Sequence, residues 1–457
     1  MASEWQRHDV ADLISKGKLV IGDGYRAKND ELGNVGLPFA RAGNINNGFQ
    51  FIDADRFPLQ NLARIGNKAS QSGDVVFTSK GTVGRFAFVS SDIHQFVYSP
   101  QLCFWRSVDT DSINPRFLYY WMLGPEFYVQ FKGVSGQTDM AEYVSLTDQR
   151  RMQITIPDID EQRAIAHILG TLDDKIELNR RMNETLEAMA RALFQSWFVD
   201  FDPVRAKAAV RREHPRWTDA AVCRAALPTL APEIAALFPD SFENSTLGDI
   251  PKGWSVGSLS DVAFLNPESW SRTTKPEIIR YIDLANTKWG RIEVITVYAK
   301  EDAPSRAQRI LRCGDTIVGT VRPGNGSYVL IAEDGLTGST GFAVLRPRKS
   351  ECREFIYLAA TTQDTIESLA HLADGGAYPA VRPEVVIAKQ LAMPPDAVIA
   401  RFSKSTGHLI SRWAEGERES RTLAALRDTL LPKLISGKLR IKTSQSEQSA
   451  PAEVCNG

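Results

Sequence analysis

The stretch that decides the fold runs from Ile156 to Ile165 and has the sequence IPDIDEQRAI. After it, apolar residues recur at alternating steps of three and four, which is typical of a helix that packs on another helix. A helix from Asp160 to Phe198 would be about 58 Å long at 1.5 Å per residue. One small domain cannot cover a helix of that length, so the segment needs a partner helix.

The chain contains that partner, because the same segment recurs at a shift of 237 residues. Ile156-Pro157 aligns with Met393-Pro394, and Thr185-Leu186 aligns with Thr422-Leu423. Chance similarity between short apolar motifs is the alternative, but four segments recur in the same order, which favours duplication. The two upstream matches, at shifts of 241 and 238, are Gly73–Phe77 with Gly314–Val318 and Phe117–Tyr119 with Phe355–Tyr357.

Each half therefore consists of a globular domain followed by a long helix. In the globular parts, short β-type runs with flanking glycines alternate with helical stretches, which is typical of α+β domains. We expect an α+β protein with two similar α/β domains in a tandem pseudo-two-fold repeat, joined by two long helices. The expected parts are domain 1 at 1–157, long helix 1 at 158–200, a connector with short helices at 201–245, domain 2 at 246–392, long helix 2 at 393–441 and a disordered tail at 442–457.

Polar residues interrupt the apolar stripe of the first long helix at Lys175, Asn179 and Ser196. They either fix the register of the helix pair or face solvent. Gly170 could separate a short first helix from the rest, and Gly416 weakens the middle of the second helix. The residues expected to pair the two helices are Ile165, Leu172, Leu186, Met189, Leu193, Leu409, Leu423, Leu426 and Leu430.

The composition excludes several classes of protein. With 54 Lys and Arg against 55 Asp and Glu, the net charge is -1, so the chain is not a uniformly basic nucleic-acid coat protein, although a local basic surface remains possible. The five cysteines are far apart and form no CxxC pair, which indicates a reducing compartment. No stretch approaches the roughly 18 apolar residues of a membrane span. We expect a cytoplasmic protein without a membrane partner.

The motifs of common enzymes are missing from the sequence. There is no GxxxxGK[ST] loop, no GxGxxG between a strand and a helix, and no HExxH among the six histidines. The strings closest to an amino-methyltransferase motif, at Asn266-Pro267 and Asp202-Pro203, do not match it. We therefore expect no catalytic, cofactor-binding or metal-binding residue in this chain.

Nucleic-acid binding has better support, from two glycine loops without acidic residues at Thr78–Val89 and Thr316–Ile331. Glycine lets a backbone approach a phosphate, and basic or amide side chains contact phosphates and bases. Ordinary hairpin tips are the alternative, and the basic cluster at 205–216 is more often a solvated face. The expected DNA-binding residues are Arg41, Asn44, Lys80, Arg85, Gln137, Thr138, Lys288, Arg322 and Asn325.

The sequence resembles the specificity subunits of type I restriction-modification systems, over nearly the whole chain from Trp5 to about Ile441. The second helix departs from the family pattern, because Asp158–Arg163 is replaced there by Pro395–Ala400. The stretches that carry the resemblance are IPDIDEQRAI at 156–165, LDDKI at 172–176, LGDIPKGW at 247–254 and LLPKLISGKL at 430–439.

The resemblance implies two target-recognition domains and two helices that pair as an antiparallel coiled coil. It implies a non-catalytic subunit that binds a bipartite asymmetric double-stranded DNA target, one half-site per domain. Adenine methylation with S-adenosylmethionine and restriction with ATP and Mg would belong to partners, two modification subunits and two restriction subunits. The alternatives are the recognition subunit of a type IIB-like enzyme and a coiled-coil scaffold that does not recognise DNA.

Overall fold

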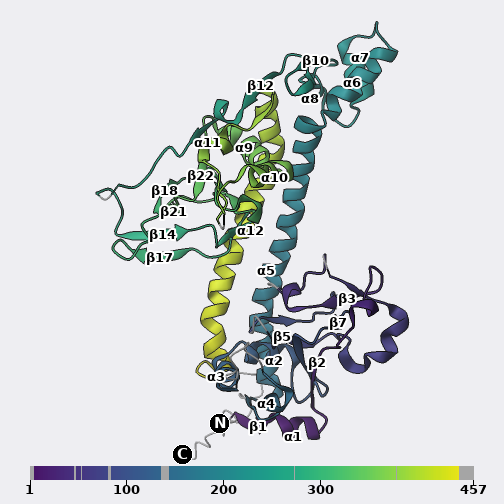
Figure 1. The fold of residues 1–457 in the computed structure, drawn as a ribbon, viewed down its shortest axis with the longest axis vertical. Helices are drawn as coiled ribbons and strands as arrows, with labels where there is room; N and C mark the ends of the chain where they lie inside the picture. The colour runs from purple at the N-terminus through teal and green to yellow at the C-terminus, as the bar shows by residue number, and fades with distance from the viewer. Residues whose placement is uncertain are drawn as a thin grey trace, which may run out of the picture. The chain divides into compact units, whose positions relative to one another are not determined.

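The computed structural model describes residues 5–441 except 46–47, 53, 81–83, 135–143, 272 and 377. It forms two compact units, one of residues 1–177 with 420–457 and one of residues 178–419. Each unit holds one mixed domain and part of each of two long helices, α5 (Ile159–Phe194) and α12 (Asp396–Ile435) (Figure 1). The expected division put whole helices between domains, whereas each helix is shared by the two units.

The first domain is built on a four-stranded antiparallel sheet with the order β2-β8-β5-β6. A smaller sheet, β4-β3-β7, contains one parallel pair, and β1 pairs with β9. The strands are β1 Gln6–Asp9, β2 Leu19–Asp23, β3 Leu37–Ala40, β4 Arg56–Phe57, β5 Val75–Thr78, β6 Phe86–Phe88, β7 Val97–Tyr98, β8 Leu102–Ser107 and β9 Gln153–Ile156. The helices are α1 Val10–Ser15, α2 Pro115–Met122, α3 Pro125–Val134 and α4 Leu146–Arg150.

Aromatic rings form the core between this sheet and helices α2 and α3. Trp105 of β8 stacks with Trp121 of α2 at a centroid distance of 6.0 Å. The ring of Phe127, on α3, meets both indoles edge-on, and Phe77 of β5 packs against Phe127 at 5.9 Å. All four rings are fully buried, and side chains of this size supply most of the hydrophobic free energy of a small domain.

The second domain has two four-stranded sheets, β13-β22-β19-β20 and β17-β14-β21-β18, and two small pairs of strands, β12-β23 and β15-β16. Its strands are β12 Ser255–Ser258, β13 Ala263–Leu265, β14 Ile278–Ile282, β15 Thr287–Lys288, β16 Arg291–Ile292, β17 Thr296–Ala299, β18 Ala307–Leu311, β19 Thr316–Gly319, β20 Tyr328–Leu330, β21 Leu336–Ser339, β22 Phe342–Pro347 and β23 Gln390–Met393. Its helices are α9 Arg353–Ala360, α10 Gln363–Leu372 and α11 Pro383–Ile387.

The two domains share one topology, which confirms the tandem repeat. The sheet β13-β22-β19-β20 repeats the strand order of β2-β8-β5-β6, and β14 pairs in parallel with β21 as β3 does with β7. The turn before the central strand is also repeated. The amide of Gly73 donates to the carbonyl of Val89 at 2.8 Å, and the amide of Gly314 donates to that of Ile331 at 2.8 Å. Both glycines have a positive φ, which other residues adopt only with strain.

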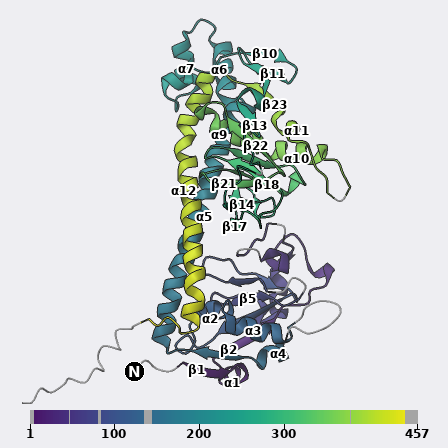
Figure 2. The same ribbon diagram turned by 90° about the vertical axis from the view of Figure 1, so that its left-hand side faces the viewer.

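Helices α5 and α12 lie side by side (Figures 1 and 2). In the first unit, Arg427 of α12 donates to Asp173 of α5 at 2.8 Å. In the second unit, Asn183 of α5 donates to Glu417 of α12 at 2.7 Å. The partner number on α12 falls as the number on α5 rises, so the pair is antiparallel, as expected.

Most of the expected pairing residues take part in the packing. Ile165 is buried in the core of the first unit, and Leu430 packs against that core. Those that are half-buried against the core of the second unit are Leu186, Leu193 and Leu409. Leu172 and Leu423 are half-buried as well.

Two of the expected pairing residues are wrong, because Met189 is 54% exposed and Leu426 is 45% exposed. In both cases the inward position belongs to the next residue: Ala190 is fully buried, and Arg427 pairs with Asp173. The neighbours one turn away on either side, Leu186 and Leu193 of α5 and Leu423 and Leu430 of α12, remain at least half-buried. At these two turns the buried stripe therefore passes through the i+4 position instead of the i+3 position, which lies on the same face of a helix just as closely.

Neither glycine breaks its helix. Gly170 lies inside α5, and a Cβ there would come within 2.7 Å of the guanidinium of Arg116. The absence of a side chain lets Arg116 donate to the carbonyl of Gly170 at 3.1 Å and to Asp174 at 2.6 Å. Close packing of this kind offsets the low helix propensity of glycine.

The connector folds as part of the second unit. Its elements are α6 Asp202–Glu213, α7 Asp219–Ala226, α8 Pro232–Ala235 and the paired strands β10 Phe242–Ser245 and β11 Gly248–Pro251. Lys207 of its basic cluster is buried and donates to the carbonyl of Ala235 at 3.1 Å. Arg211 donates to Asp240 at 2.6 Å. Two cations of the cluster thus hold the connector together.

Candidate nucleic-acid interface

The most prominent candidate surface is the loop between β19 and β20 in the second domain. The hairpin closes through the amide of Gly319, which donates to the carbonyl of Ser327 at 2.7 Å. Between them, Arg322 has φ +47° and Gly326 has φ +66°, so the chain turns twice through the left-handed region. Arg322 and Asn325 are exposed at its tip. A tight turn of this kind holds its side chains in a defined place.

Two exposed aromatic residues flank this loop, and sequence analysis missed both. Trp289 is 50% exposed, and its amide donates to the carbonyl of Gly326 at 2.7 Å. Tyr378 is 70% exposed, and the guanidinium carbon of Arg322 lies 4.6 Å from the centroid of its ring. Lys288, also exposed, precedes Trp289 in the β15–β16 turn. The structure therefore brings three predicted residues, Lys288, Arg322 and Asn325, to one surface with two aromatic rings.

We call this surface the Arg322 loop surface, and it comprises Lys288, Trp289, Arg322, Asn325 and Tyr378. Its chemistry fits nucleic acid: cations attract phosphates, amides bond base edges, and aromatic rings contact bases. Arginine stacked on an aromatic ring also loses less side-chain freedom when it binds. No carboxylate occurs in the run Thr316–Ile331 that forms the loop.

In the first domain, Arg85 ties the corresponding loop to its neighbour. Its guanidinium donates to the carbonyl of Ile45 at 3.3 Å and to that of Ala42 at 3.4 Å. Both carbonyls belong to the turn that follows β3, where Arg41 and Asn44 also lie. The structure therefore brings Arg85 together with the Arg41–Asn44 turn.

The two glycine loops, at Thr78–Val89 and Thr316–Ile331, lie at matching positions of the repeat, but Arg85 and Arg322 do not align with each other. The amide of Thr78 donates to the carbonyl of Arg85 at 3.0 Å, just as that of Gly319 donates to Ser327. Arg85 therefore matches Ser327, whose hydroxyl donates to the carbonyl of Leu284 at 3.0 Å, in the loop after β14. The loop of the second domain is one residue longer, with seven residues between Gly319 and Ser327 against six between Thr78 and Arg85.

The amide of Asn44 holds its own turn. Its Oδ1 accepts from the amide of Arg41 at 2.8 Å, and its Nδ2 donates to the carbonyl of Gln50 at 2.9 Å. This geometry, in which a short amide side chain caps a turn, is common in loops. Arg41 forms an ion pair with Asp55 at 2.6 Å, with both side chains nearly half exposed. Arg41 is thus at the surface, whereas the hydrogen bonds of Asn44 are used inside the domain.

The remaining predicted residues of the first domain are placed less fully. Lys80 lies two residues after the end of β5 and is half-buried. Gln137 and Thr138 lie outside the described residues. So do Asn46 and Asn47, which follow the Arg41–Asn44 turn, and residues 81–83 of the loop between β5 and β6.

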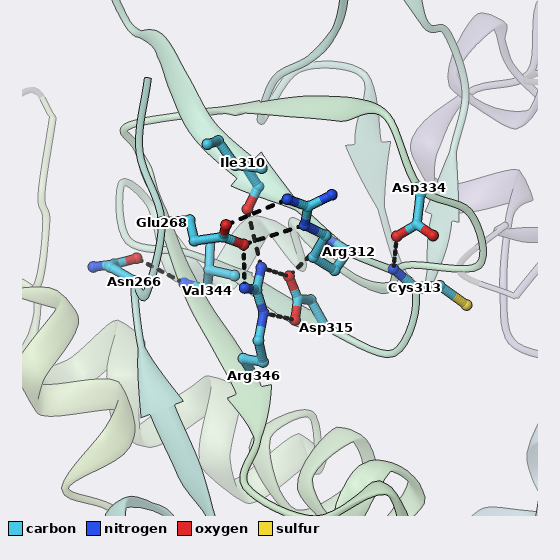
Figure 3. A network of polar contacts seen from close by, with 9 residues as sticks. All are labelled: Asn266, Glu268, Ile310, Arg312, Cys313, Asp315, Asp334, Val344 and Arg346. Atoms are coloured by element: carbon cyan, nitrogen blue, oxygen red, sulfur yellow. Dashed lines mark hydrogen bonds and ion pairs between the residues drawn. The ribbon is translucent and has the colours of Figure 1, made fainter. Parts of the chain in front are cut away.

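A polar network supports the sheet that carries the Arg322 loop (Figure 3). Arg346 of β22 donates to Asp315 at 2.8 Å through both Nε and Nη2, and it also bonds Glu268. Arg312 donates to Glu268 at 3.2 Å. These hydrogen bonds, from Arg312 and then from Arg346, lower the pKa of Glu268 to about 2. The first domain repeats the central pair, since Arg106 donates to Asp74 at 2.5 Å.

The part of the chain that the structure describes contains neither a metal-binding cluster nor a membrane-spanning helix. Among them, no group of three or more His, Cys, Asp or Glu side chains is arranged to hold a metal ion. No helix in the described ranges has the length and apolar character needed to cross a membrane. That the chain is non-catalytic stays a prediction.

The sequence is similar to known proteins over most of its length. Residues 3–188 match the family described as the type I restriction modification DNA specificity domain. The chain is 23% identical to the type I restriction enzyme HindI specificity subunit of Haemophilus influenzae, over 96% of this chain and 100% of that protein. It is also 23% identical to the MjaIX specificity subunit of Methanocaldococcus jannaschii, over 81% of this chain and 78% of that protein.

A solved structure shows the same fold. The S subunit of a type I restriction-modification system from M. genitalium has a TM-score of 0.53 and 13% sequence identity, with 96% of this chain and 97% of that chain covered. The fold and the repeat define a protein with two related mixed domains and an antiparallel pair of long helices. Residues 3–188 thus match a type I specificity domain, and the chain is similar over most of its length to specificity subunits of type I restriction enzymes.

Proposed function

We propose that this chain is the sequence-specific DNA-binding subunit of a type I restriction-modification complex. It recognises a bipartite asymmetric target, with one half-site per domain. The observation that carries the proposal is the duplication of one domain with different loops in the two copies. The second copy presents Arg322 on Tyr378, whereas in the first copy Arg85 bonds the neighbouring turn. Because the two loops differ, the two half-sites differ in sequence.

The Arg322 loop surface makes the contacts of the second domain with DNA. Lys288 lies in the adjoining turn and neutralises a phosphate, which gives affinity without sequence preference. Arg322 and Asn325, at the loop tip, bond base edges in the groove. The chain as a whole has a net charge of -1, so DNA binding depends on such local surfaces rather than on overall charge.

The chemistry of methylation and restriction belongs to partner subunits. Two modification subunits methylate target adenines with S-adenosylmethionine, and two restriction subunits use ATP and Mg. This chain directs both activities to the target and binds no cofactor itself. The complex acts in the cytoplasm, where the host and foreign DNA meet it.

The test is to change Arg322 and Lys288 separately to Ala in the chain assembled with its modification subunits. Methylation is then measured across a randomised target library and at several salt concentrations. Arg322→Ala should relax specificity at one position of one half-site and cost about 1–3 kcal/mol there. Lys288→Ala should weaken binding to all sequences and lower the salt slope by about 1.

Arg348→Ala is the matched control. The guanidinium carbon of Arg348 lies 4.2 Å from the ring centroid of Phe264, so it is another exposed arginine on an aromatic ring. It follows Pro347, whereas the Arg322 loop adjoins Phe342 at the opposite end of β22. The control should leave specificity unchanged. If the assembled complex shows neither salt-dependent nor sequence-selective binding, the chain is a scaffold and the proposal fails.

A further inference from the structure

Trp289 is held in an unusual way for a half-exposed tryptophan. It lies at the tip of the β15–β16 turn with φ +48°, a left-handed conformation that is strained for a residue with a side chain. Its ring lies against Gly326, where a Cβ would be 2.5 Å from the indole. The ring also meets that of Tyr328 edge-on at 6.0 Å. One side of the indole is therefore packed and the other is open.

The packing of Trp289 leaves a large apolar surface exposed beside cations. Lys288 precedes it, and the backbone hydrogen bond from Trp289 to Gly326 attaches it to the loop that carries Arg322 and Asn325. Burial in the domain core does not explain this arrangement, since half of the side chain faces solvent. A strained backbone that positions an exposed side chain is a feature of binding sites.

We propose that Trp289 is a specificity-determining residue that makes an apolar contact with the 5-methyl group of a thymine in duplex DNA. This inference rests on the proposed function, because it assigns a contact within the same surface. Thymine is the base that presents a methyl group in the major groove, where side chains distinguish it by apolar contact. Insertion between stacked bases needs a freely projecting wedge, and the packed side of Trp289 against Gly326 and Tyr328 does not provide one.

The polar members of the surface complement this contact. Arg322 and Asn325 can bond guanine or adenine edges, but neither distinguishes thymine by its methyl group. An indole fixed next to them adds the apolar part of the recognition. The half-site of the second domain should therefore contain a thymine beside the bases that Arg322 and Asn325 contact.

The experiment uses duplexes that carry the recognised DNA sequence and replaces its thymines by uracil one at a time. Each replacement removes the 5-methyl group of one thymine and changes no hydrogen bond. Affinity is measured for the full chain assembled with its modification subunits, on duplexes whose sequence comes from mapping methylated adenines. One replacement, in the half-site of the second domain, should weaken binding about fourfold, the value for burying one methyl group. With Trp289→Ala, binding to the thymine duplex should fall by at least as much, and thymine and uracil should bind equally.

Trp217→Ala is the matched control, because Trp217 is 42% exposed but lies in the connector, stacked on His214 at 3.8 Å. It should leave the ratio of thymine to uracil binding unchanged. Trp289→Leu keeps an apolar side chain at the site and should retain part of that ratio. Thermal unfolding of each variant monitors the fold of the second domain.

The outcomes separate this inference from the proposed function. If Arg322→Ala and Lys288→Ala weaken binding but Trp289→Ala keeps the ratio of thymine to uracil binding, the methyl contact is wrong and the DNA-binding surface stands. If no uracil replacement weakens DNA binding by the wild-type protein, that result alone overturns the inference. If none of the three variants affects binding, the proposed function of this surface fails as well.

Discussion

At the scale of single residues, ion pairs that recur in both domains fix the central strands. Arg346 bonds Asp315 in the second domain, and Arg106 bonds Asp74 in the first. Both aspartates are fully or almost fully buried, so each needs its arginine to offset the cost of desolvation. The second domain adds Glu268, which lies closer to solvent and bonds Arg346 and Arg312 (Figure 3).

The hydrogen bonds of Glu268 should make the second unit less stable as the pH falls. Its pKa is lowered to about 2 from the ordinary 4.5. A folded-state pKa below the unfolded value means that the stabilisation is present above pH 4.5 and is lost as the pH falls towards 2. Glu268→Gln should reduce the free energy of unfolding by about 1 kcal/mol at pH 7, since its side chain is 37% exposed, and by less at pH 3.

Denaturant unfolding of the full chain at the two pH values measures this effect. Glu277→Gln is the control, because Glu277 forms an ion pair with Lys300 but its side chain is 82% exposed. That variant should change the stability little at either pH. An equal loss for Glu268→Gln at pH 7 and pH 3 would contradict the assigned pKa.

Gly326 should be irreplaceable beside Trp289. An alanine there must adopt φ +66° and brings its Cβ to 2.5 Å from the indole. Gly326→Ala should cost more than the about 1–2 kcal/mol of the left-handed conformation alone and should displace Trp289. Gly253→Ala is the control for that conformation, since Gly253 has φ +83° with no atom within 4 Å of the added Cβ. If the two variants lose the same free energy of unfolding, the indole of Trp289 moves aside without an energetic cost.

At the scale of elements, the helix pair contains a buried polar layer. Asn179 and Asn183 are 0% and 1% exposed, and they donate to Glu419 and Glu417 of α12 at 2.8 and 2.7 Å. Buried asparagines in paired helices favour one register over others at a cost in stability. Gly416 faces Asn183, and its lack of a side chain gives the amide its room. The alternative that the polar residues of α5 face solvent is therefore wrong for Asn179.

Gly416→Ala and Gly407→Ala should have opposite effects on stability, although both glycines lie inside α12. A Cβ on Gly416 would be 2.6 Å from Oδ1 of Asn183, so the variant should lose about 1–3 kcal/mol. At Gly407 the nearest atom is 3.4 Å away, and alanine should gain up to about 1 kcal/mol of helix propensity. Calorimetric or denaturant unfolding measures both changes.

The collision has its own test, the double variant Asn183→Ala with Gly416→Ala. Shortening Asn183 removes the atom that the new Cβ meets, so the added cost of Gly416→Ala should largely disappear in that background. If the two losses simply add, Asn183 and Gly416 do not interact.

At the scale of the whole molecule, each unit has its own domain and core. The central helices are shared, but the hydrophobic cluster around Trp105 and Trp121 is separate from that around Phe198 and Phe402. A domain with a separate core can be exchanged without repacking the other.

Exchange of residues 246–392 for the corresponding domain of a similar specificity subunit should therefore change one half-site only. The half-site of the first domain should stay as it was, because its loops and their supporting contacts, such as Arg85 to Ile45, lie within the first unit. Mapping of methylated adenines in cells that express the hybrid with its modification subunits measures the outcome. A change in both half-sites would mean that the two domains do not recognise DNA independently.

Much of the fold could be predicted from the sequence because the signals are local. The three-four apolar pattern after Pro157 and its recurrence at a shift of 237 predicted two long helices and the tandem domains. The same pattern was wrong for Met189 and Leu426, since both i+3 and i+4 lie near one helix face and the partner helix decides which of the two is buried.

The sequence by itself determined the duplication, the helices and the resemblance to type I specificity subunits, because periodicity and motifs lie within continuous segments. Only the tertiary structure decided which side chains share a surface. Trp289 and Tyr378 are 89 residues apart, and the Arg322 loop brings them together through backbone bonds and stacking. Arg85 is a residue type that often contacts DNA, yet its guanidinium donates to the carbonyl of Ile45, 40 residues away in the sequence. Long-range contacts of this kind depend on how strands cross and pair, which no local pattern encodes.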